Sequence, residues 1–363
     1  MIFTNGYIVL EDCILEDGSV VVSGDRITAV SAERADGTDI YDLRGMYLIP
    51  GFVDIHCHAG GNKWFFEDPA RAARSHLEAG TTSVFASLWH NAGFDSFEKA
   101  IERIVRAAAE PDSNIRGIHM EGPYVDPTLG SDSEHARPIN EDEYKSMIRA
   151  AEGMIRVWTF DPCLEGAREF ARYARENNIV LAVCYSKAGP ELLRTYLPYG
   201  LRIGSHIFCG TGAPQPRFKG TVEPGSDFFV LGEDSMTAEL IADSAGAHVR
   251  PFLLDFVYRL KGADRIALVS DCCAGGDTLG SDVNIIDGVL YGSRLTLATA
   301  FRNMRAATQT DLIDLCKMTS TTPARVGGLT DCGSIRPGKR ADLLVMDGNY
   351  QIQAVFLGGR QIV

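Results

Sequence analysis

The chain has 363 residues, of which 45% are hydrophobic and 23% charged, and its formal net charge is −13. These values are typical of a globular protein with a large core, and an acidic chain without a Lys/Arg run argues against a nucleic-acid or anionic-membrane surface. The acidic N-terminal segment is unlike a signal peptide, no apolar run approaches the roughly 20 residues that span a bilayer, and nine scattered cysteines suit a reducing compartment, so we expect a cytoplasmic protein.

Residues 1–49 contain short apolar segments separated by turns. The Gly24-Asp25 turn lies between two such segments, which is the pattern of a β-hairpin. Residues 335–363 show the same pattern of short apolar segments separated by turns. Because both ends are β-rich and the middle differs, we expect residues 1–49 plus 335–363 to form one small β-sandwich domain. Residues 50–334 then form a second domain.

The middle of the chain alternates strand-like and helical segments. The strand-like segments are residues 52–58, 82–88, 115–121, 155–161, 179–185, 202–208, 237–243 and 265–271. Residues 96–110 and 164–178, among the segments between them, have apolar side chains three and four positions apart, as in amphipathic helices. Eight such alternations predict an α/β fold, a (β/α)₈ barrel of the TIM type rather than an open sheet.

Polar residues of metal-binding types stand at or near the C-terminal ends of these predicted strands. They are His56 and His58, Glu121, Asp161, Tyr185, His206, Asp243 and Asp271. The carboxyl ends of barrel strands meet at one mouth, where barrel enzymes have their active sites. The sequence therefore predicts a metal-dependent active site at the mouth.

The first two candidate ligands are His56 and His58. Side chains alternate along a strand, so both imidazoles lie on one face while Cys57 faces outward. Glu121 ends a buried strand, where a carboxylate is costly unless it is paired or metal-bound. His206 is the next candidate. The alternatives are a chance pair of buried histidines, a salt-bridged structural glutamate and a hydrogen-bonded core histidine.

Asp271 closes the last predicted strand. A carboxylate beside a metal-bound water can accept its proton and pass it to a leaving amine. The metal lowers the pKa of that water to about 7. An aspartate that caps the following loop is the structural alternative.

Other polar residues lie in segments between the predicted strands. Arg217 and His248 follow strands, and an arginine there can bind a phosphate or carboxylate with two hydrogen bonds, although a solvated arginine is the ordinary alternative. His76 lies in a helical segment and is expected to be structural. His90 follows the second predicted strand, near the mouth, and has no assigned role.

Several segments, in this order, resemble the N-acetylglucosamine-6-phosphate deacetylase family of the amidohydrolase superfamily: PGFVDIHCHAGG, HMEGPYVDP, GSHIF, LVSD and GSIRPGKRADLLV. The resemblance covers nearly the whole chain. It implies an N-acetylhexosamine 6-phosphate as substrate, N-acetylglucosamine 6-phosphate first, with release of acetate. It also implies one or two divalent metal ions (zinc first, iron or manganese as alternatives) and a homodimer.

The resemblance also implies roles for individual residues. The metal ligands are His56, His58, Glu121, His206 and Asp271, with Asp271 also acting as base and acid; the substrate-binding residues are His248, Arg217, His135, Cys209 and Gly210. Arg217 acts in its own or in a neighbouring subunit. Tyr185 stands where the family has a histidine, and a phenol ionises only near 10. The second metal site then lacks one ligand.

Two alternative functions stay open from the sequence. Amidohydrolases that cleave cyclic amides or dipeptides commonly recruit a modified lysine, but Phe160-Asp161-Pro162 ends the fourth strand without one. A barrel that binds sugar phosphates without catalysis is suggested by Tyr185, whereas the intact set of ligands and Asp271 argues against it.

Overall fold

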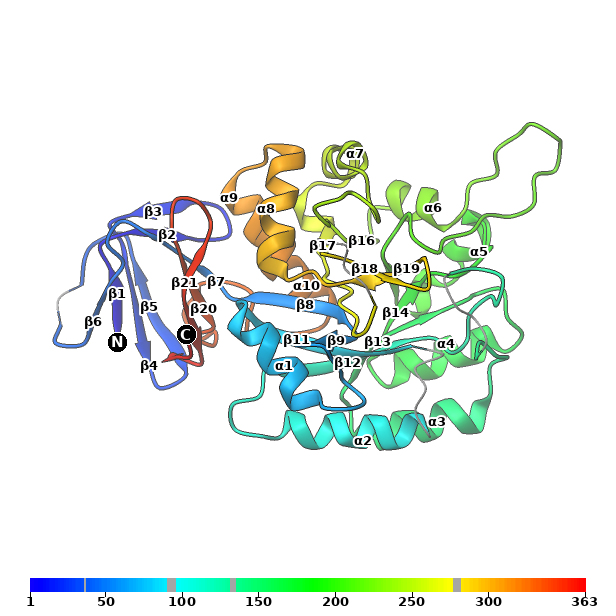
Figure 1. Ribbon diagram of the computed structural model, residues 1–363, viewed down its shortest axis with the longest axis horizontal. Coiled ribbons are helices and arrows are strands. Elements are labelled where there is room, and N and C mark those ends of the chain that lie inside the picture. Colours follow the sequence, from blue (N-terminus) through cyan, green and yellow to red (C-terminus); the bar gives the residue numbers. More distant parts are fainter. Residues whose placement is uncertain (36, 90–95, 131–134, 277–281) are drawn as a thin grey trace.

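The computed structural model describes residues 1–35, 37–89, 96–130, 135–276 and 282–363. Figure 1 shows two parts side by side, a β-rich part that contains both chain ends and a larger barrel with its helices. Within the described ranges, no helix is long and apolar enough to cross a membrane.

Eight parallel strands form the barrel in the order β17-β16-β15-β14-β13-β12-β11-β8. Their bounds are β8 (Phe52–Cys57), β11 (Thr81–Trp89), β12 (Ile115–Glu121), β13 (Ile155–Phe160), β14 (Val180–Val183), β15 (Leu201–Gly204), β16 (Thr237–Leu240) and β17 (Ile266–Leu268). Each of the eight predicted segments overlaps one of these strands, so the predicted (β/α)₈ barrel is confirmed.

The barrel closes between its first and last strands. The Asp271 N–H donates to the His56 carbonyl at 2.9 Å, and the His58 N–H donates to the Cys272 carbonyl at 3.0 Å. All residues of β8 and β11 are buried, because side chains fill the barrel inside and helices cover it outside.

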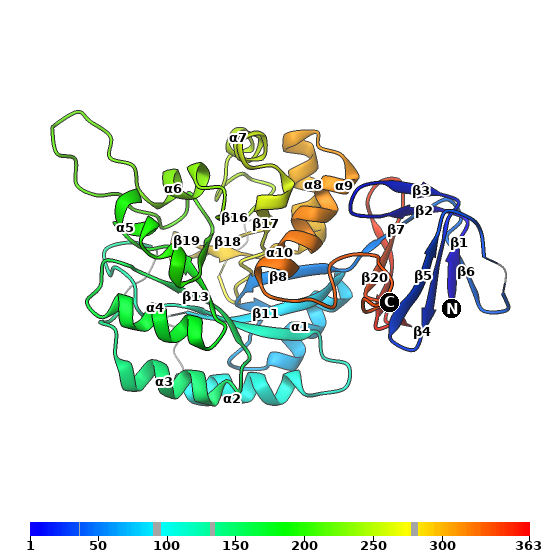
Figure 2. The same ribbon diagram turned by 180° about the vertical axis from the view of Figure 1, so that it is seen from behind.

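Helices pack around the outside of the barrel (Figures 1 and 2). They are α1 (Pro69–Glu78), α2 (Phe97–Ala108), α3 (Glu141–Ala150), α4 (Ala167–Glu176), α5 (Pro190–Arg194), α6 (Ser226–Gly232), α7 (Pro251–Lys261), α8 (Leu297–Thr308), α9 (Leu312–Cys316) and α10 (Thr322–Val326). Ser96 begins α2 by accepting a hydrogen bond from the Lys99 N–H, and Asn140 does the same for α3 with the Glu143 N–H. Both are residue types that favour helix starts. The helix α2 lies within the helical segment predicted at residues 96–110.

The β-rich part contains two sheets, ordered β5-β4-β1-β6 and β22-β21-β20-β7-β2-β3. The strands are β1 (Ile2–Thr4), β2 (Tyr7–Val9), β3 (Ile14–Glu16), β4 (Ser19–Ser23), β5 (Arg26–Ser31), β6 (Ile40–Asp42), β7 (Tyr47–Pro50), β20 (Leu343–Met346), β21 (Ile352–Leu357) and β22 (Arg360–Gln361). The predicted hairpin around Gly24-Asp25 is confirmed as β4 and β5.

The two chain ends join through β7 and β20, which pair antiparallel with Leu344 opposite Ile49. Apolar side chains of both sheets, among them Phe3, Leu48 and Phe356, form a core separate from that of the barrel. The predicted sandwich built from both termini is therefore confirmed. The division between residues 1–49 plus 335–363 and residues 50–334 stays a proposed boundary.

Short elements complete the fold. They are β9 (Ala59–Gly60), β10 (Lys63–Trp64), β18 (Val283–Ile286), β19 (Val289–Ser293) and the single turns Leu197–Tyr199, Ala263–Arg265 and Lys317–Thr321. The antiparallel pair β18 and β19 lies over the mouth of the barrel, where Val289 and Leu290 help to line the cavity described below.

Candidate active site

Five polar side chains meet at the carboxyl ends of the barrel strands. His56 lies on β8 and His58 just beyond it, Glu121 is the last residue of β12, and His206 and Asp271 follow β15 and β17. Their exposed fractions lie between 0% and 9%. The barrel thus brings together residues that are up to 215 positions apart, as the strand-end pattern predicts.

Four of these side chains surround one point. His58 Nε2 lies 3.2 Å from Glu121 Oε2 and 3.3 Å from Asp271 Oδ1. His56 Nε2 lies 3.7 Å from Glu121 Oε1 and 3.9 Å from Asp271 Oδ1. The buried Nε2 of His56 has no hydrogen-bond partner among the described residues. An unpaired imidazole nitrogen beside two carboxylates fits a divalent cation, for which imidazole and carboxylate are ordinary ligands.

Glu239 orients His56. Its Oε2 lies 3.0 Å from His56 Nδ1, and it also accepts a hydrogen bond from the His206 N–H at 3.3 Å. A carboxylate bound to one imidazole nitrogen directs the other nitrogen toward a metal. Burial lowers the pKa of His56, but Glu239 and Glu121 outweigh burial and raise it to about 10. In the metal-free protein this imidazole therefore holds a proton that a divalent cation would replace.

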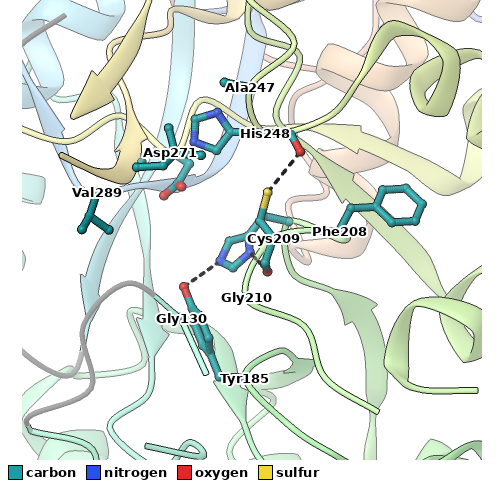
Figure 3. A pocket seen from close by; sticks show the side chains of 12 residues that line it. Gly130, Tyr185, Phe208, Cys209, Gly210, Ala247, His248, Asp271 and Val289 are labelled. Atoms are coloured by element: carbon teal, nitrogen blue, oxygen red, sulfur yellow. Dashed lines mark hydrogen bonds between the residues drawn. The ribbon is translucent and has the colours of Figure 1, made fainter. Parts of the chain in front are cut away.

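Tyr185 fills the other side of Glu121. Its hydroxyl donates to Glu121 Oε1 at 2.9 Å and lies 3.3 Å from His206 Nε2, which is itself 2.7 Å from the same carboxylate oxygen. In Figure 3 a dashed line from the Tyr185 hydroxyl marks the 3.3 Å contact. Burial, followed by the charge of Glu121, raises the pKa of Tyr185 well above its ordinary value. The phenol is therefore protonated and acts as a hydrogen-bond donor.

A cavity of about 430 Å³ opens beside these residues. It is lined by Gly130, Tyr185, His206, Phe208, Cys209, Gly210, Ala247, His248, Asp271, Val289, Leu290 and Gly292. In Figure 3 the His248 ring lies next to the Asp271 carboxylate on one wall, and Tyr185 lies on the opposite side. The cavity is large enough for a small-molecule ligand.

His248 is held in place by Asp243. Asp243 Oδ2 lies 3.0 Å from His248 Nδ1 and accepts the His248 N–H at 2.9 Å. Burial raises the pKa of Asp243, but its hydrogen bonds with His248 and the Ala247 N–H outweigh burial and lower it. The buried Nε2 of His248 has no partner in the described part of the chain, so it is available to a ligand in the cavity.

Comparison with known proteins gives one consistent result. Residues 236–362 match the model of the Amidohydrolase family. The chain is 27% identical over 377 residues to an N-acetylglucosamine-6-phosphate deacetylase of Bacillus subtilis (strain 168), covering 95% of this chain and 92% of the relative. It is also 25% identical over 373 residues to an N-acetylgalactosamine-6-phosphate deacetylase of Shewanella sp. (strain ANA-3), covering 96% of this chain and 91% of the relative.

A solved structure agrees with these relatives over the whole chain. It is an aspartate-to-alanine mutant of N-acetyl-D-glucosamine-6-phosphate deacetylase from Mycobacterium smegmatis in complex with N-acetyl-D-glucosamine-6-phosphate. Its TM-score is 0.88 at 26% identity, covering 100% of this chain and 99% of that chain. The chain is an amidohydrolase. This amidohydrolase keeps its candidate ligands at the strand ends, where the barrel fold places active sites.

Not every predicted residue reaches the site of this amidohydrolase. Arg217 is exposed on the loop of residues 205–225, which projects beyond α5 and α6 (Figure 1), and it does not line the cavity of its own chain. His135 is exposed and also lies outside the cavity lining. His90 lies outside the described residues. Asp161, although at a strand end, accepts a hydrogen bond from the Ser186 hydroxyl instead of facing the ligands.

Two residues that support the site were not predicted from the sequence. Glu239 lies inside an apolar strand, and the cost of burying a carboxylate was the signal that could have identified it. His119 was noticed only as part of the HMEGP segment. Its Nδ1 lies 2.9 Å from the Ile55 carbonyl and its ring centre 4.2 Å from that of His56. Burial, followed by the charge of His56, holds its pKa well below the ordinary value, so it packs beneath the site as a neutral ring.

Proposed function

We propose that this amidohydrolase cleaves the acetamide of an N-acetylhexosamine 6-phosphate, with N-acetylglucosamine 6-phosphate as its first substrate. The products are acetate and the amino sugar phosphate. The observation that carries the proposal is the position of Asp271. Its carboxylate contacts the His56, His58 and Glu121 group and also lines the cavity that contains His248. The names of the relatives from Bacillus subtilis and Shewanella support the reaction and the class of substrate.

We propose a single divalent ion at His56, His58, Glu121 and Asp271, with zinc as the first choice and iron or manganese as alternatives. Nitrogen and carboxylate ligands suit all three metals. When bound, the ion supplies a Lewis acid for the acetyl carbonyl and makes hydroxide available near neutral pH. His206 lies where a second metal ion would bind, on the other side of Glu121. There the Tyr185 hydroxyl already contacts both His206 and Glu121. A protonated phenol there disfavours a second cation.

Asp271 carries the proton in the proposed reaction. Its carboxylate lies between the ligand group and the cavity, so it can accept a proton from the attacking water and deliver it to the departing nitrogen. Burial raises the pKa of Asp271, but hydrogen bonding to His58 and the charge of His56 outweigh burial and lower it. The carboxylate is therefore ionised and ready to act as a base at neutral pH.

The substrate is held by residues around the cavity. His248, whose Nδ1 is fixed by Asp243, presents Nε2 to a sugar hydroxyl or phosphate oxygen. Cys209 and Gly210 line the same wall, and burial raises the pKa of the Cys209 thiol to about 12, so it stays uncharged. We assign phosphate binding to Arg217 and a further substrate contact to His135. Each contact forms when the segment that carries the residue reaches the substrate, in its own subunit or in a second one.

We propose a cytoplasmic homodimer in which the loop of residues 205–225 reaches the neighbouring subunit. Phe218 and Val222 on this loop are 64% and 79% exposed, which is unusual for large apolar side chains in water. The Arg217 guanidinium packs over the Phe218 ring at 5.4 Å. All nine cysteines fall in the described ranges and are free thiols, in keeping with a reducing compartment.

An acetate-release assay tests the proposed function. Metal-replete protein is incubated with the 6-phosphates of N-acetylglucosamine, N-acetylgalactosamine and N-acetylmannosamine, and with unphosphorylated N-acetylglucosamine as a control. We expect release of acetate from at least the first sugar phosphate and a much lower kcat/KM without the phosphate. If zinc-, iron- and manganese-loaded samples release no acetate from any of the sugar phosphates, the proposal is wrong.

A further inference from the structure

A second group of metal-binding side chains lies on the outer face of the strand that carries His56 and His58. Asp54, Cys57 and His76 each place one potential ligand atom within 4.8 Å of the others. Their exposed fractions are 0%, 0% and 2%. The Cys57 sulfur is 3.0 Å from His76 Nε2. The Cys272 side chain interacts with the same imidazole, so two thiols, one imidazole and one carboxylate gather behind the active site.

An irregularity in β8 brings Asp54 and Cys57 to the same face. Asp54 pairs with Val84 of β11, whereas Cys57 pairs with Ala86, so three steps along β8 match two steps along β11. One extra residue reverses the alternation of side chains. The bulge therefore turns Asp54 toward α1, although strict alternation would place it inside the barrel with His56.

The other members come from elements packed against β8. His76 is on the buried face of α1, and its Nε2 lies 2.8 Å from the Ala59 carbonyl. Cys272 directly follows Asp271, and its carbonyl accepts the His58 and Ala59 N–H groups at 3.0 and 2.7 Å. The cluster thus joins the first barrel strand, the first helix and the segment that closes the barrel.

Two polar atoms of the cluster are left without partners. Asp54 Oδ1 accepts the His56 and Ser270 N–H groups at 3.2 and 3.3 Å. Asp54 Oδ2 and His76 Nδ1 have no hydrogen-bond partner within the described ranges, and both atoms are buried. A buried carboxylate oxygen without a partner costs free energy that a bound cation would recover.

We infer that Asp54, Cys57, His76 and Cys272 form a second metal site, which takes a zinc ion with a structural role. Two thiolates, one imidazole and one carboxylate form a four-ligand set, and thiolate ligands favour zinc over magnesium, calcium or manganese. With four protein ligands the ion has no open position for water or substrate. Binding releases the two thiol protons to solvent and replaces the Cys57 contact with the Ala59 carbonyl, 3.2 Å long, by a metal bond.

Such a site would hold the backbone that carries the catalytic ligands in place from the outer side of the barrel. Cys57 lies between His56 and His58, and Cys272 is adjacent to Asp271. A zinc ion that joins these two segments to α1 would set the separation between the first and last strands of the barrel. The inference does not depend on the proposed substrate, because none of these four side chains lines the described cavity.

Cobalt substitution tests the inference, because the proposed catalytic ligands contain no sulfur. The full chain is stripped of metal under reducing conditions and reloaded with Co²⁺, and its absorption is recorded together with the number of ions per chain. We expect two ions and a thiolate-to-cobalt charge-transfer band in the near ultraviolet. Cys57→Ser and Cys272→Ser, made separately, should each weaken or abolish this band and lose one ion. Cys316→Ser, which changes a buried thiol in α9, is the matched control and should retain the thiolate band and both ions.

Three results would overturn the inference. They are a wild-type spectrum without the thiolate band, a band that survives in both folded variants, and a band lost equally in the control. If both cluster variants fail to fold, X-ray absorption of the zinc-loaded wild type decides. Zinc–sulfur scattering at about 2.3 Å supports the site, and a shell of nitrogen and oxygen alone rejects it. A protein that shows the band but releases no acetate would contradict the proposed function and leave the second site standing.

Discussion

At the level of single residues, the site is built on an unusual backbone. Tyr185, His206 and Asp271 have φ values of 45°, 26° and 46°, in the left-handed region that non-glycine residues rarely adopt. Each such residue costs about 1–3 kcal/mol and persists only where surrounding contacts hold it. All three lie two or three positions after the end of a barrel strand, so the turn that aims each side chain at the mouth is the source of the strain.

Asp271→Asn separates metal binding from proton transfer. The amide keeps one oxygen toward His58 but cannot accept a proton at neutral pH. We expect metal content close to that of the wild type and a kcat lowered about 10²- to 10⁴-fold, the usual contribution of a positioned base. Elemental analysis and acetate release on the same sample check this. Activity close to that of the wild type would show that another group carries the proton.

Tyr185→His tests whether the phenol prevents a second ion from binding. An imidazole at this position, beside Glu121 and His206, completes a second set of ligands. We expect the catalytic centre to bind two ions in place of one. Tyr185→Phe is the control, since it removes the hydroxyl without adding a ligand and should leave the number unchanged. Ions are counted by difference from the wild type, so metal bound at the rear cluster cancels. An unchanged count in Tyr185→His would reject this role for Tyr185.

At the level of helices and strands, the sequence predicted most of what positions the site. All eight barrel strands were found because each is an apolar run bounded by helical or turn segments, and their ends carried the ligands. Glu239 and Asp54 could not be placed in the same way. Glu239 supports His56 from β16, which is separated from β8 by β17, a contact set by the curvature of the barrel. Asp54 faces outward only because of the bulge in β8, and strict alternation cannot reveal a bulge.

The C-terminus of α6 depends on Lys261 of α7. The Lys261 ammonium donates to the Val230 and Glu233 carbonyls, both at 2.8 Å, and so satisfies the helix end. Burial, followed by the charge of Arg265, lowers the pKa of Lys261 from 10.5 to about 8. Between these two pH values the unfolded chain binds more protons than the folded one, so this lysine makes the folded state more stable as pH rises.

Comparison of the wild type with Lys261→Met isolates this effect. We expect the free energy of unfolding of the wild type to rise relative to that of the variant from about pH 8 toward pH 10, with little change of the difference below pH 8. Urea unfolding of both proteins at several pH values provides the measurement. A difference that stays constant over this range would mean that the folded-state pKa of Lys261 is not lowered.

At the level of the whole molecule, the projecting loop of residues 205–225 is the feature that a single chain does not explain. It connects β15 to α6, and it carries both Arg217 and the most exposed large apolar side chains of its neighbourhood. The sequence could place these residues in a loop but not decide whether the loop folds over its own cavity. In the structure its first residues, including Cys209 and Gly210, line the cavity, and its outer part extends away from the barrel (Figure 2).

Phe218→Asp therefore tests the proposed dimer. A buried charge at the contact should shift the protein toward monomers in light scattering, and KM for the sugar phosphate should rise because Arg217 no longer reaches a neighbouring site. Phe252→Asp, which changes a side chain that is 71% exposed on α7, is the control and should leave the mass unchanged. If the wild type is itself monomeric at micromolar concentration, the dimer is ruled out, and Arg217 must act within its own chain.

The pairing of β7 with β20 has a consequence for synthesis. β7 leads directly into β8, the strand that carries His56, and it lies between two partners: β2 comes before it, but β20 lies almost 300 positions later in the chain. Barrel strands can pair with their neighbours in the order in which they leave the ribosome, but the sheet that anchors β7 is completed only by residues 343–357. One of the two strands that hold β7 is thus among the last parts of the molecule to form, and in a nascent chain stalled before this point β7 would be paired on the β2 side alone.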